Sequence, residues 1–179
     1  MVVRADFHAT QAAEIAFGLI GANALVHVAE RVVDAARRWT VRYAPGEVRA
    51  TCRDSGSETV SDSLHTAGKP TRIVLTPDAQ SVGSTFDDMV YVRARVVDAN
   101  GVTVPSADQR LHFAVKGAGQ LIATDNGSSV DHIPFPSPDR TALNGVAVAL
   151  VRGAGKGRFT VTATTEGLRA GSVDLEATR

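Results

Sequence analysis

The sequence predicts a mainly β protein, and three observations carry that prediction. From residue 39 onward, short runs of alternating apolar and polar residues recur, separated by Gly, Pro, Asn and Asp. Alternation with a period of two is typical of strands that bury one face. No helical pattern that could connect parallel strands lies between these runs, so antiparallel sheets are expected. An apolar content of 44% is enough for a sizeable core.

The first 38 residues have a different texture. They are rich in Ala and contain no Pro, and between Ala12 and Arg38 apolar residues recur at spacings of three and four. Such spacing favours one apolar face of a helix, although Gly18 and Gly21 weaken that interpretation. Residues 1–38 are therefore expected to be helical or disordered.

The next segment, residues 39–69, is expected to form a partial β-sandwich and a linker. Residues 39–43 alternate, Ala44-Pro45-Gly46 forms a turn, and residues 47–52 alternate back, which is the pattern of a hairpin. Residues 59–64 are a further candidate strand, and residues 66–70 have the composition of a linker.

Residues 70–179 are expected to form an immunoglobulin-like β-sandwich. About seven alternating runs follow one another, and turn signals such as Asn100-Gly101 and Asn144-Gly145 separate them at the spacing typical of that fold. The parity of the runs predicts a core that includes Val92, Phe113, Val148, Phe159 and Val161.

Charge and cysteine content exclude several classes of partner and site. Lys plus Arg and Asp plus Glu both total 19, so nothing in the net charge favours binding to nucleic acid or to an anionic membrane. Cys52 is the single cysteine, which excludes an internal disulfide and a Cys-rich zinc site. No apolar run reaches the roughly 18–20 residues of a membrane-spanning helix. Asp6 and Glu14 occupy the region where a signal peptide carries positive charge, so no signal peptide is predicted.

No catalytic residue, metal site or cofactor site is predicted. Gly153-Ala-Gly-Lys-Gly157 lacks the spacing and the Ser or Thr of a phosphate-binding loop, and Gly residues of this kind are typical of a hairpin turn. None of the five histidines stands in His-x-x-x-His spacing.

One loop is a candidate contact surface. Residues 128–139 contain three prolines around Phe135, and loops of this length often contact a partner. The candidate contact residues in and beside this loop are Asp125, Asn126, Asp131, His132 and Phe135.

Several segments, in this order, resemble one family. They are Trp39-Thr-Val-Arg-Tyr-Ala-Pro-Gly46, Thr66-Ala-Gly-Lys-Pro70, Ile73-Val-Leu-Thr-Pro-Asp78, Asp125-Asn126-Gly127 and His132-Ile-Pro-Phe135. Together they are similar to the C-terminal accessory domains of family 2 glycoside hydrolases of the β-galactosidase type. The resemblance covers residues 39–179, whereas residues 1–38 do not match the start of the first accessory sandwich.

This resemblance implies a non-catalytic C-terminal region or fragment of a sugar-cleaving enzyme. The catalytic glutamates of that family lie in a central (β/α)₈ barrel, and no segment of this chain matches them. The implied partner is that barrel, or another domain of a parent polypeptide, and the implied location of the parent is periplasmic or secreted.

Two other interpretations stay open. The second sandwich is also similar to bacterial immunoglobulin-like adhesion modules. A carbohydrate-binding accessory domain is the third interpretation, although aromatic residues make up only 5% of the chain.

Overall fold

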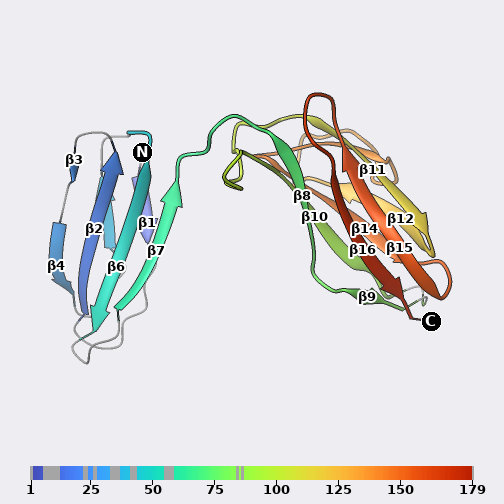
Figure 1. Ribbon diagram of the computed structural model, residues 1–179, viewed down its shortest axis with the longest axis horizontal. Coiled ribbons are helices and arrows are strands. Elements are labelled where there is room, and N and C mark those ends of the chain that lie inside the picture. The colour runs from blue at the N-terminus through green and yellow to red at the C-terminus, as the bar shows by residue number, and fades with distance from the viewer. Residues whose placement is uncertain are drawn as a thin grey trace. The chain divides into compact units, whose positions relative to one another are not determined.

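The computed structural model shows strands and turns, with no helix among the residues that it describes (Figure 1). It describes residues 2–5, 13–21, 24–25, 28–32, 37–40, 44–54, 59–83, 85 and 87–178, and the side chains within 44–51, 61–83, 85 and 87–178. The predicted mainly β class is confirmed. In this described part, no helix is long and apolar enough to cross a membrane. The chain divides into two units, Met1–Thr66 and Ala67–Arg179.

The first unit contains a two-stranded sheet and a larger antiparallel sheet. Its strands are β1 (Val2–Ala5), β2 (Ala13–Gly21), β3 (Ala24–Leu25), β4 (Val28–Val32), β5 (Arg37–Thr40), β6 (Glu47–Asp54) and β7 (Thr59–His65). Strand β1 pairs with β5, and the larger sheet has the order β3-β2-β6-β7, with β4 also paired to β2.

The helix predicted near the N-terminus is wrong for the residues described there. Residues 13–21 form strand β2, which pairs with β6 from Ala13↔Asp54 to Ile20↔Glu47 and with β4 on its other side. Helix propensity is a weak preference that tertiary pairing overrides. A strand paired on both sides satisfies its backbone groups, and Gly18 and Gly21 already disfavour a helix.

The second unit consists of two sheets. Its strands are β8 (Arg72–Pro77), β9 (Ser81–Val82), β10 (Val90–Val97), β11 (Arg110–Gly117), β12 (Gly119–Asp125), β13 (Asp139–Thr141), β14 (Val146–Gly153), β15 (Gly157–Thr164) and β16 (Gly171–Ala177). The four-stranded sheet has the order β12-β14-β10-β8, and the five-stranded sheet has the order β13-β11-β15-β16-β9. All of these pairs are antiparallel except β9 with β16.

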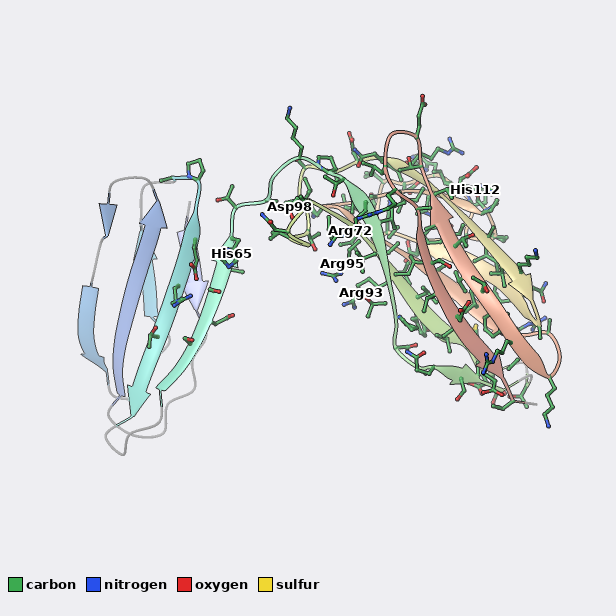
Figure 2. All side chains as sticks on the ribbon, in the orientation of Figure 1. His65, Arg72, Arg93, Arg95, Asp98 and His112 are labelled. Atoms are coloured by element: carbon green, nitrogen blue, oxygen red, sulfur yellow. The ribbon has the colours of Figure 1, made fainter. Side chains whose placement is uncertain are left out.

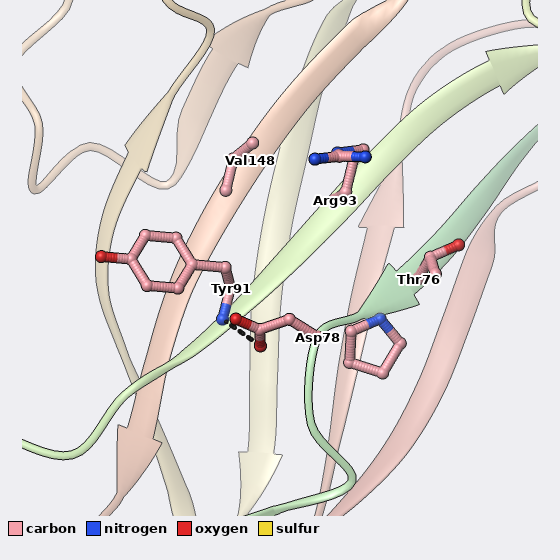
Figure 3. A pocket seen from close by; sticks show the side chains of 6 residues that line it. Thr76, Asp78, Tyr91, Arg93 and Val148 are labelled. Carbon is pink, nitrogen blue, oxygen red and sulfur yellow. Dashed lines mark hydrogen bonds between the residues drawn. The ribbon is translucent and has the colours of Figure 1, made fainter. Parts of the chain in front are cut away.

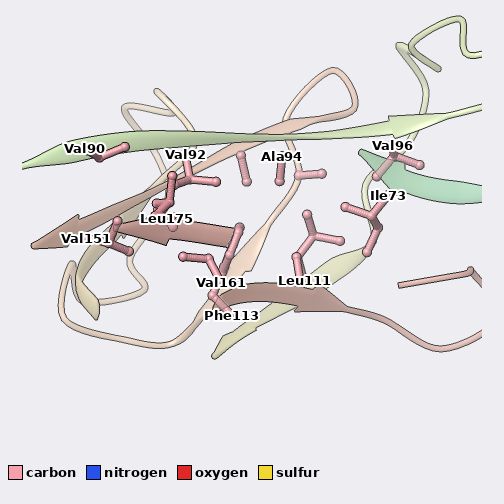
Figure 4. Close-up of a cluster of buried hydrophobic side chains, with 14 of the residues drawn as sticks. Ile73, Val90, Val92, Ala94, Val96, Leu111, Phe113, Val151, Val161 and Leu175 are labelled. Atoms are coloured by element: carbon pink, nitrogen blue, oxygen red, sulfur yellow. The ribbon is translucent and has the colours of Figure 1, made fainter. Parts of the chain in front are cut away.

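The core of the second unit lies between these two sheets (Figure 4). Strand β10 contributes Val92, Ala94 and Val96, which are fully buried, and the five-stranded sheet contributes Phe113 and Phe159 among others. The predicted burial of Val92, Phe113, Phe159 and Val161 is confirmed. Burying a Val, Leu or Phe side chain stabilises a fold by about 1.5–3 kcal/mol, so this cluster dominates the stability of the unit.

The predicted burial of Val148 is wrong. Strand β14 buries Ala147, Ala149 and Val151, and it turns Val148 to the outer face of the four-stranded sheet. Residues 146–151 are apolar at both parities, so alternation alone cannot choose the buried face. The hairpin turn before the strand fixes the register, because Asn144 and Gly145 both have positive φ, the signature of a two-residue type I′ turn.

Truncation of Phe159 tests the core. Phe159 is 2% exposed and its ring lies against Gly119, where an added Cβ would come within 2.4 Å of the ring. Replacing Phe159 with Ala is expected to lower the free energy of unfolding of the second unit by about 3–5 kcal/mol, because a cavity is left. Chemical denaturation followed by circular dichroism measures this loss. The exposed Phe135→Ala control should lose about 1 kcal/mol or less, and a similar small loss for Phe159→Ala would contradict the packing.

Candidate functional site

The loop between β12 and β13, residues 126–138, is built around the buried side chain of Arg140. Arg140 lies on β13 and is only 1% exposed. A charged side chain is almost never this buried unless every donor has a partner. The hydrogen bonds of this guanidinium therefore explain the conformation of the loop.

All five N–H groups of the guanidinium are used. Nε donates to Thr124 Oγ1 at 3.2 Å, and Nη2 donates to the carbonyl oxygens of Thr124 at 2.7 Å and Pro134 at 3.0 Å. Nη1 donates to Asp131 Oδ2 at 3.1 Å and to the carbonyl oxygen of Ile133 at 2.9 Å. Arg has five donors in a planar fork, so none is left unsatisfied. The side chain thus joins the end of β12 to Asp131, Ile133 and Pro134 of the loop.

Asp131 supplies the negative charge that balances Arg140. Its Oδ1 accepts a hydrogen bond from the backbone N–H of Ile133 at 2.9 Å, and its Oδ2 also accepts one from Asn126 Nδ2 at 2.8 Å. The N–H of Ile133 and, beyond it, the Arg140 guanidinium hold the pKa of Asp131 below its usual value. The carboxylate therefore stays ionised and part of the loop's framework.

Asp125 and Asn126 are also held by bonds within the chain. Asp125 Oδ1 accepts from the backbone N–H groups of Asn126 and Gly127. The side chain of Asn126 donates to the carbonyl oxygen of Thr141 and accepts from the N–H of Ser128. Of the five residues that the sequence singles out here, these two and Asp131 thus shape the loop.

The other two candidate contact residues face solvent. His132 is exposed and Phe135 is 63% exposed, with the Arg140 Cζ atom 5.9 Å from the Phe135 ring centroid. That distance is within the range of a cation–π contact, so the ring is positioned as well as exposed. Val130, which sequence analysis does not identify, is 76% exposed. The loop therefore presents apolar side chains on a framework fixed by hydrogen bonds.

The buried carboxylate of Asp98 fixes the start of the second unit (Figure 2). Asp98 Oδ2 accepts from the N–H of Gly68 at 2.8 Å, and Oδ1 accepts from the N–H groups of Asn100 and Val102. Arg72 donates to the Asp98 carbonyl oxygen at 3.0 Å. The Gly68 N–H is the main cause of the lowered pKa of Asp98. These bonds tie the linker residue Gly68 to the turn at residues 98–102.

The described side chains do not gather into a metal-binding cluster. Within that part of the chain, no group of three or more His, Cys, Asp or Glu residues could hold a metal ion. On the surface, His112 Nδ1 lies 2.8 Å from Asp139 Oδ1. Arg110 Nη2 lies 3.4 Å from the other oxygen of that carboxylate, Oδ2. The His112 hydrogen bond, followed by the charge of Arg110, lowers the pKa of Asp139.

Comparison with protein families assigns the second unit. The model of the "Glycoside hydrolase family 2 C-terminal domain 5" family matches residues 73–174. The chain belongs to this family. The match spans the sandwich and includes the Arg140 loop, which favours the glycoside hydrolase interpretation over the adhesion-module alternative.

Two curated relatives are similar in sequence. A β-galactosidase of Bacteroides ovatus is 35% identical over 140 residues, which are 78% of this chain and 16% of that protein. A β-galactosidase of Thermoanaerobacter pseudethanolicus is 30% identical over 82 residues, which are 46% of this chain and 11% of that protein. The chain thus spans a small part of the length of either relative.

Solved structures of this family share the fold. A β-glycosidase from Bacteroides vulgatus matches with a TM-score of 0.81 and 25% identity, over 93% of this chain and 21% of that one. A family 2 glycosyl hydrolase from Bacteroides cellulosilyticus matches with a TM-score of 0.79 and 22% identity, over 93% of this chain and 22% of that one. Both matches cover residues of the two units.

The resemblance noted in the sequence is therefore confirmed. The chain corresponds to a C-terminal region of a family 2 glycoside hydrolase of the β-galactosidase-like kind. A (β/α)₈ barrel takes about 200 residues or more and alternates strands with helices, whereas the described residues form strands that pair antiparallel except for β9 with β16. No (β/α)₈ barrel is therefore present among the described residues.

Replacement of Arg140 tests the loop framework. Arg140→Met keeps an unbranched side chain but removes every donor, so Asp131 loses its balancing positive charge and three carbonyl oxygens each lose a hydrogen bond. The free energy of unfolding of the second unit should fall by about 3–5 kcal/mol, as when one member of a buried ion pair is removed. The matched control is Arg158→Met on the outer face of the five-stranded sheet, which should cost about 0.5 kcal/mol or less. Equal losses for the two variants in chemical denaturation would show that the network is not important for stability.

The pH dependence of stability tests the role of Asp131. The folded pKa of Asp131 lies below the ordinary value of 3.8, so its stabilising contribution is present above that pH and is lost as the pH falls through the folded pKa. Asp131→Asn should lower stability at neutral pH and flatten the loss of stability below about pH 4. Unfolding curves for both proteins between neutral and strongly acidic pH measure the slopes. Identical slopes would mean that Asp131 does not gain from ionisation in the folded state.

Proposed function

We propose that this chain is the non-catalytic support region of a glycosidase that cleaves β-galactosides, and that the Arg140 loop, residues 126–138, contacts a neighbouring catalytic domain. The names of the two curated relatives support the substrate class. The small share of each relative that the chain spans leaves ample length there for a catalytic barrel. In this proposal residues 70–179 act as the immunoglobulin-like sandwich of the parent enzyme.

The observation that carries the contact proposal is the combination of a rigid base with an exposed apolar tip. Val130 and Phe135 are 76% and 63% exposed, yet their loop is fixed by the Arg140 bonds. Single exposed apolar residues are common on protein surfaces. A loop that is ordered before binding loses little conformational entropy on docking, so it suits a permanent contact between domains.

The proposed contribution to the enzyme is mechanical. A second domain packed on the loop would bury Val130 and Phe135 and would restrict how the catalytic domain opens. The chain itself supplies no general acid, base or nucleophile in this proposal. It should therefore show no galactoside hydrolysis when purified alone.

The test uses the native polypeptide that carries this sequence, detected by an antibody against residues 70–179. We expect a species several times heavier than 18.8 kDa that co-purifies with β-galactosidase activity. In that polypeptide, the double variant Val130→Ser with Phe135→Ser should shorten the half-life of activity at elevated temperature about tenfold, corresponding to about 1.4 kcal/mol of lost contact energy. The kcat/KM of the surviving enzyme should be unchanged.

The matched control is Leu64→Ser, which replaces an exposed leucine on β7. It should leave the half-life unchanged. A native species of 18.8 kDa without any glycosidase activity would refute the proposed support role. Equal half-lives for the control and the double variant would refute the loop contact alone.

A further inference from the structure

The outer face of the four-stranded sheet is hollowed beside Tyr91 (Figure 3). The hollow has a volume of about 350 Å³ and is lined by Thr76, Pro77, Asp78, Tyr91, Arg93 and Val148. That volume is at the lower end of the range of about 300–1,000 Å³ for small-molecule sites. The hollow is therefore large enough for a small ligand.

Strand register brings these side chains together. Tyr91 and Arg93 are two residues apart on β10, so both project from the outer face. Arg93 is paired with Thr76 on β8 and with Val148 on β14. The outward turn of Val148, which overturned the predicted parity, thus supplies one wall of the hollow.

Asp78 is fixed in a position to accept hydrogen bonds. Its backbone N–H donates to the Tyr91 carbonyl oxygen at 3.1 Å, and its Oδ1 accepts from the Tyr91 N–H at 2.9 Å. Among the described residues, nothing donates to its Oδ2 atom. An oriented carboxylate oxygen is thus available to a ligand.

Arg93 supplies donors in the same hollow. Its side chain is exposed and, within the described part of the chain, makes no hydrogen bond or ion pair. Other polar groups on the outer faces of the two sheets pair with one another, as in Arg152 with Gln120 at 3.2 Å on the four-stranded sheet and Thr160 with Asp174 at 2.6 Å on the five-stranded sheet. Within the described part of the chain, Arg93 and Asp78 Oδ2 therefore leave donors and an acceptor in this hollow for a polar ligand.

Tyr91 adds an apolar surface to these polar groups. The side chain is 50% exposed and lies at the edge of the hollow. Aromatic rings with an exposed face offer a large, rigid contact area for apolar C–H groups. A pyranose has one face of C–H groups and a rim of hydroxyls that both donate and accept, which matches a ring beside a carboxylate and a guanidinium.

We propose that this hollow binds a neutral saccharide, with one sugar ring on Tyr91 and its hydroxyls bonded to Asp78 and Arg93. The charges of Asp78 and Arg93 balance each other in this hollow, so it offers no net positive charge that would select an anionic sugar or a phosphate. The proposal stands on the geometry of the hollow and does not depend on the proposed support role. It assigns the carbohydrate-binding interpretation of the sequence to this hollow on the four-stranded sheet.

Titration of the 179-residue chain with methyl β-D-galactoside, methyl β-D-glucoside and galacturonate tests the proposal. Amide chemical shifts from ¹⁵N NMR report the site directly. We expect saturable shifts at Thr76, Asp78, Tyr91 and Arg93 with at least one neutral glycoside, at a Kd of about 1–10 mM. Tyr91→Ala and Asp78→Asn should each weaken binding about tenfold.

Two matched controls separate this site from general surface binding. Phe135→Ala removes an exposed aromatic ring outside the hollow, and Arg158→Ala removes an exposed guanidinium on the other sheet. Both should leave the Kd unchanged. Absence of saturable shifts with either neutral glycoside, or equal binding by the Tyr91→Ala variant, would overturn the proposal, as would a preference for galacturonate. Because this assay needs no catalytic domain, failure here would leave the support role unaffected.

Discussion

The conformation of the longest loop in the second unit depends on one buried guanidinium. Arg140 places a positive charge inside the protein, and this is tolerable only because all five donors have acceptors and Asp131 lies beside it. Most of those acceptors are backbone carbonyl oxygens. The framework therefore constrains the path of the chain and not the identity of the side chains at the tip. A rigid loop whose tip residues are free to vary is well suited to a contact surface.

The sequence predicted the fold best where only one parity is apolar. In β10, Val90, Val92 and Val96 alternate with polar residues, so the buried face was unambiguous. In β14, both parities are apolar and the small Ala147 and Ala149 turned out to be the buried set. Small alanines from one sheet share the core with Phe113 and Phe159 from the other. The turn at Asn144 and Gly145 fixes which parity is buried, and the small alanines leave room for the large rings opposite.

Two other features could not be predicted because they depend on contacts that residues make outside their own strand. Residues 13–21 resemble a helix locally, and their strand conformation comes from pairing with residues 47–54. Arg140 resembles an ordinary surface residue beside Asp139, and its burial depends on acceptors at Thr124, Asp131 and Pro134. The sequence identified the loop by its prolines and its length, but not the side chain that organises it.

The polar groups on the outer faces of the second unit are satisfied in two ways. Thr160 with Asp174 on the five-stranded sheet, and Arg152 with Gln120 on the four-stranded sheet, bond within their own face. On the four-stranded sheet, Arg93 and one oxygen of Asp78 are left to external partners among the described residues, next to an exposed ring. Water satisfies such groups without cost when they stand alone. Their convergence around a concave, partly apolar surface makes a ligand a better partner than water, because it can bond both groups while covering Tyr91.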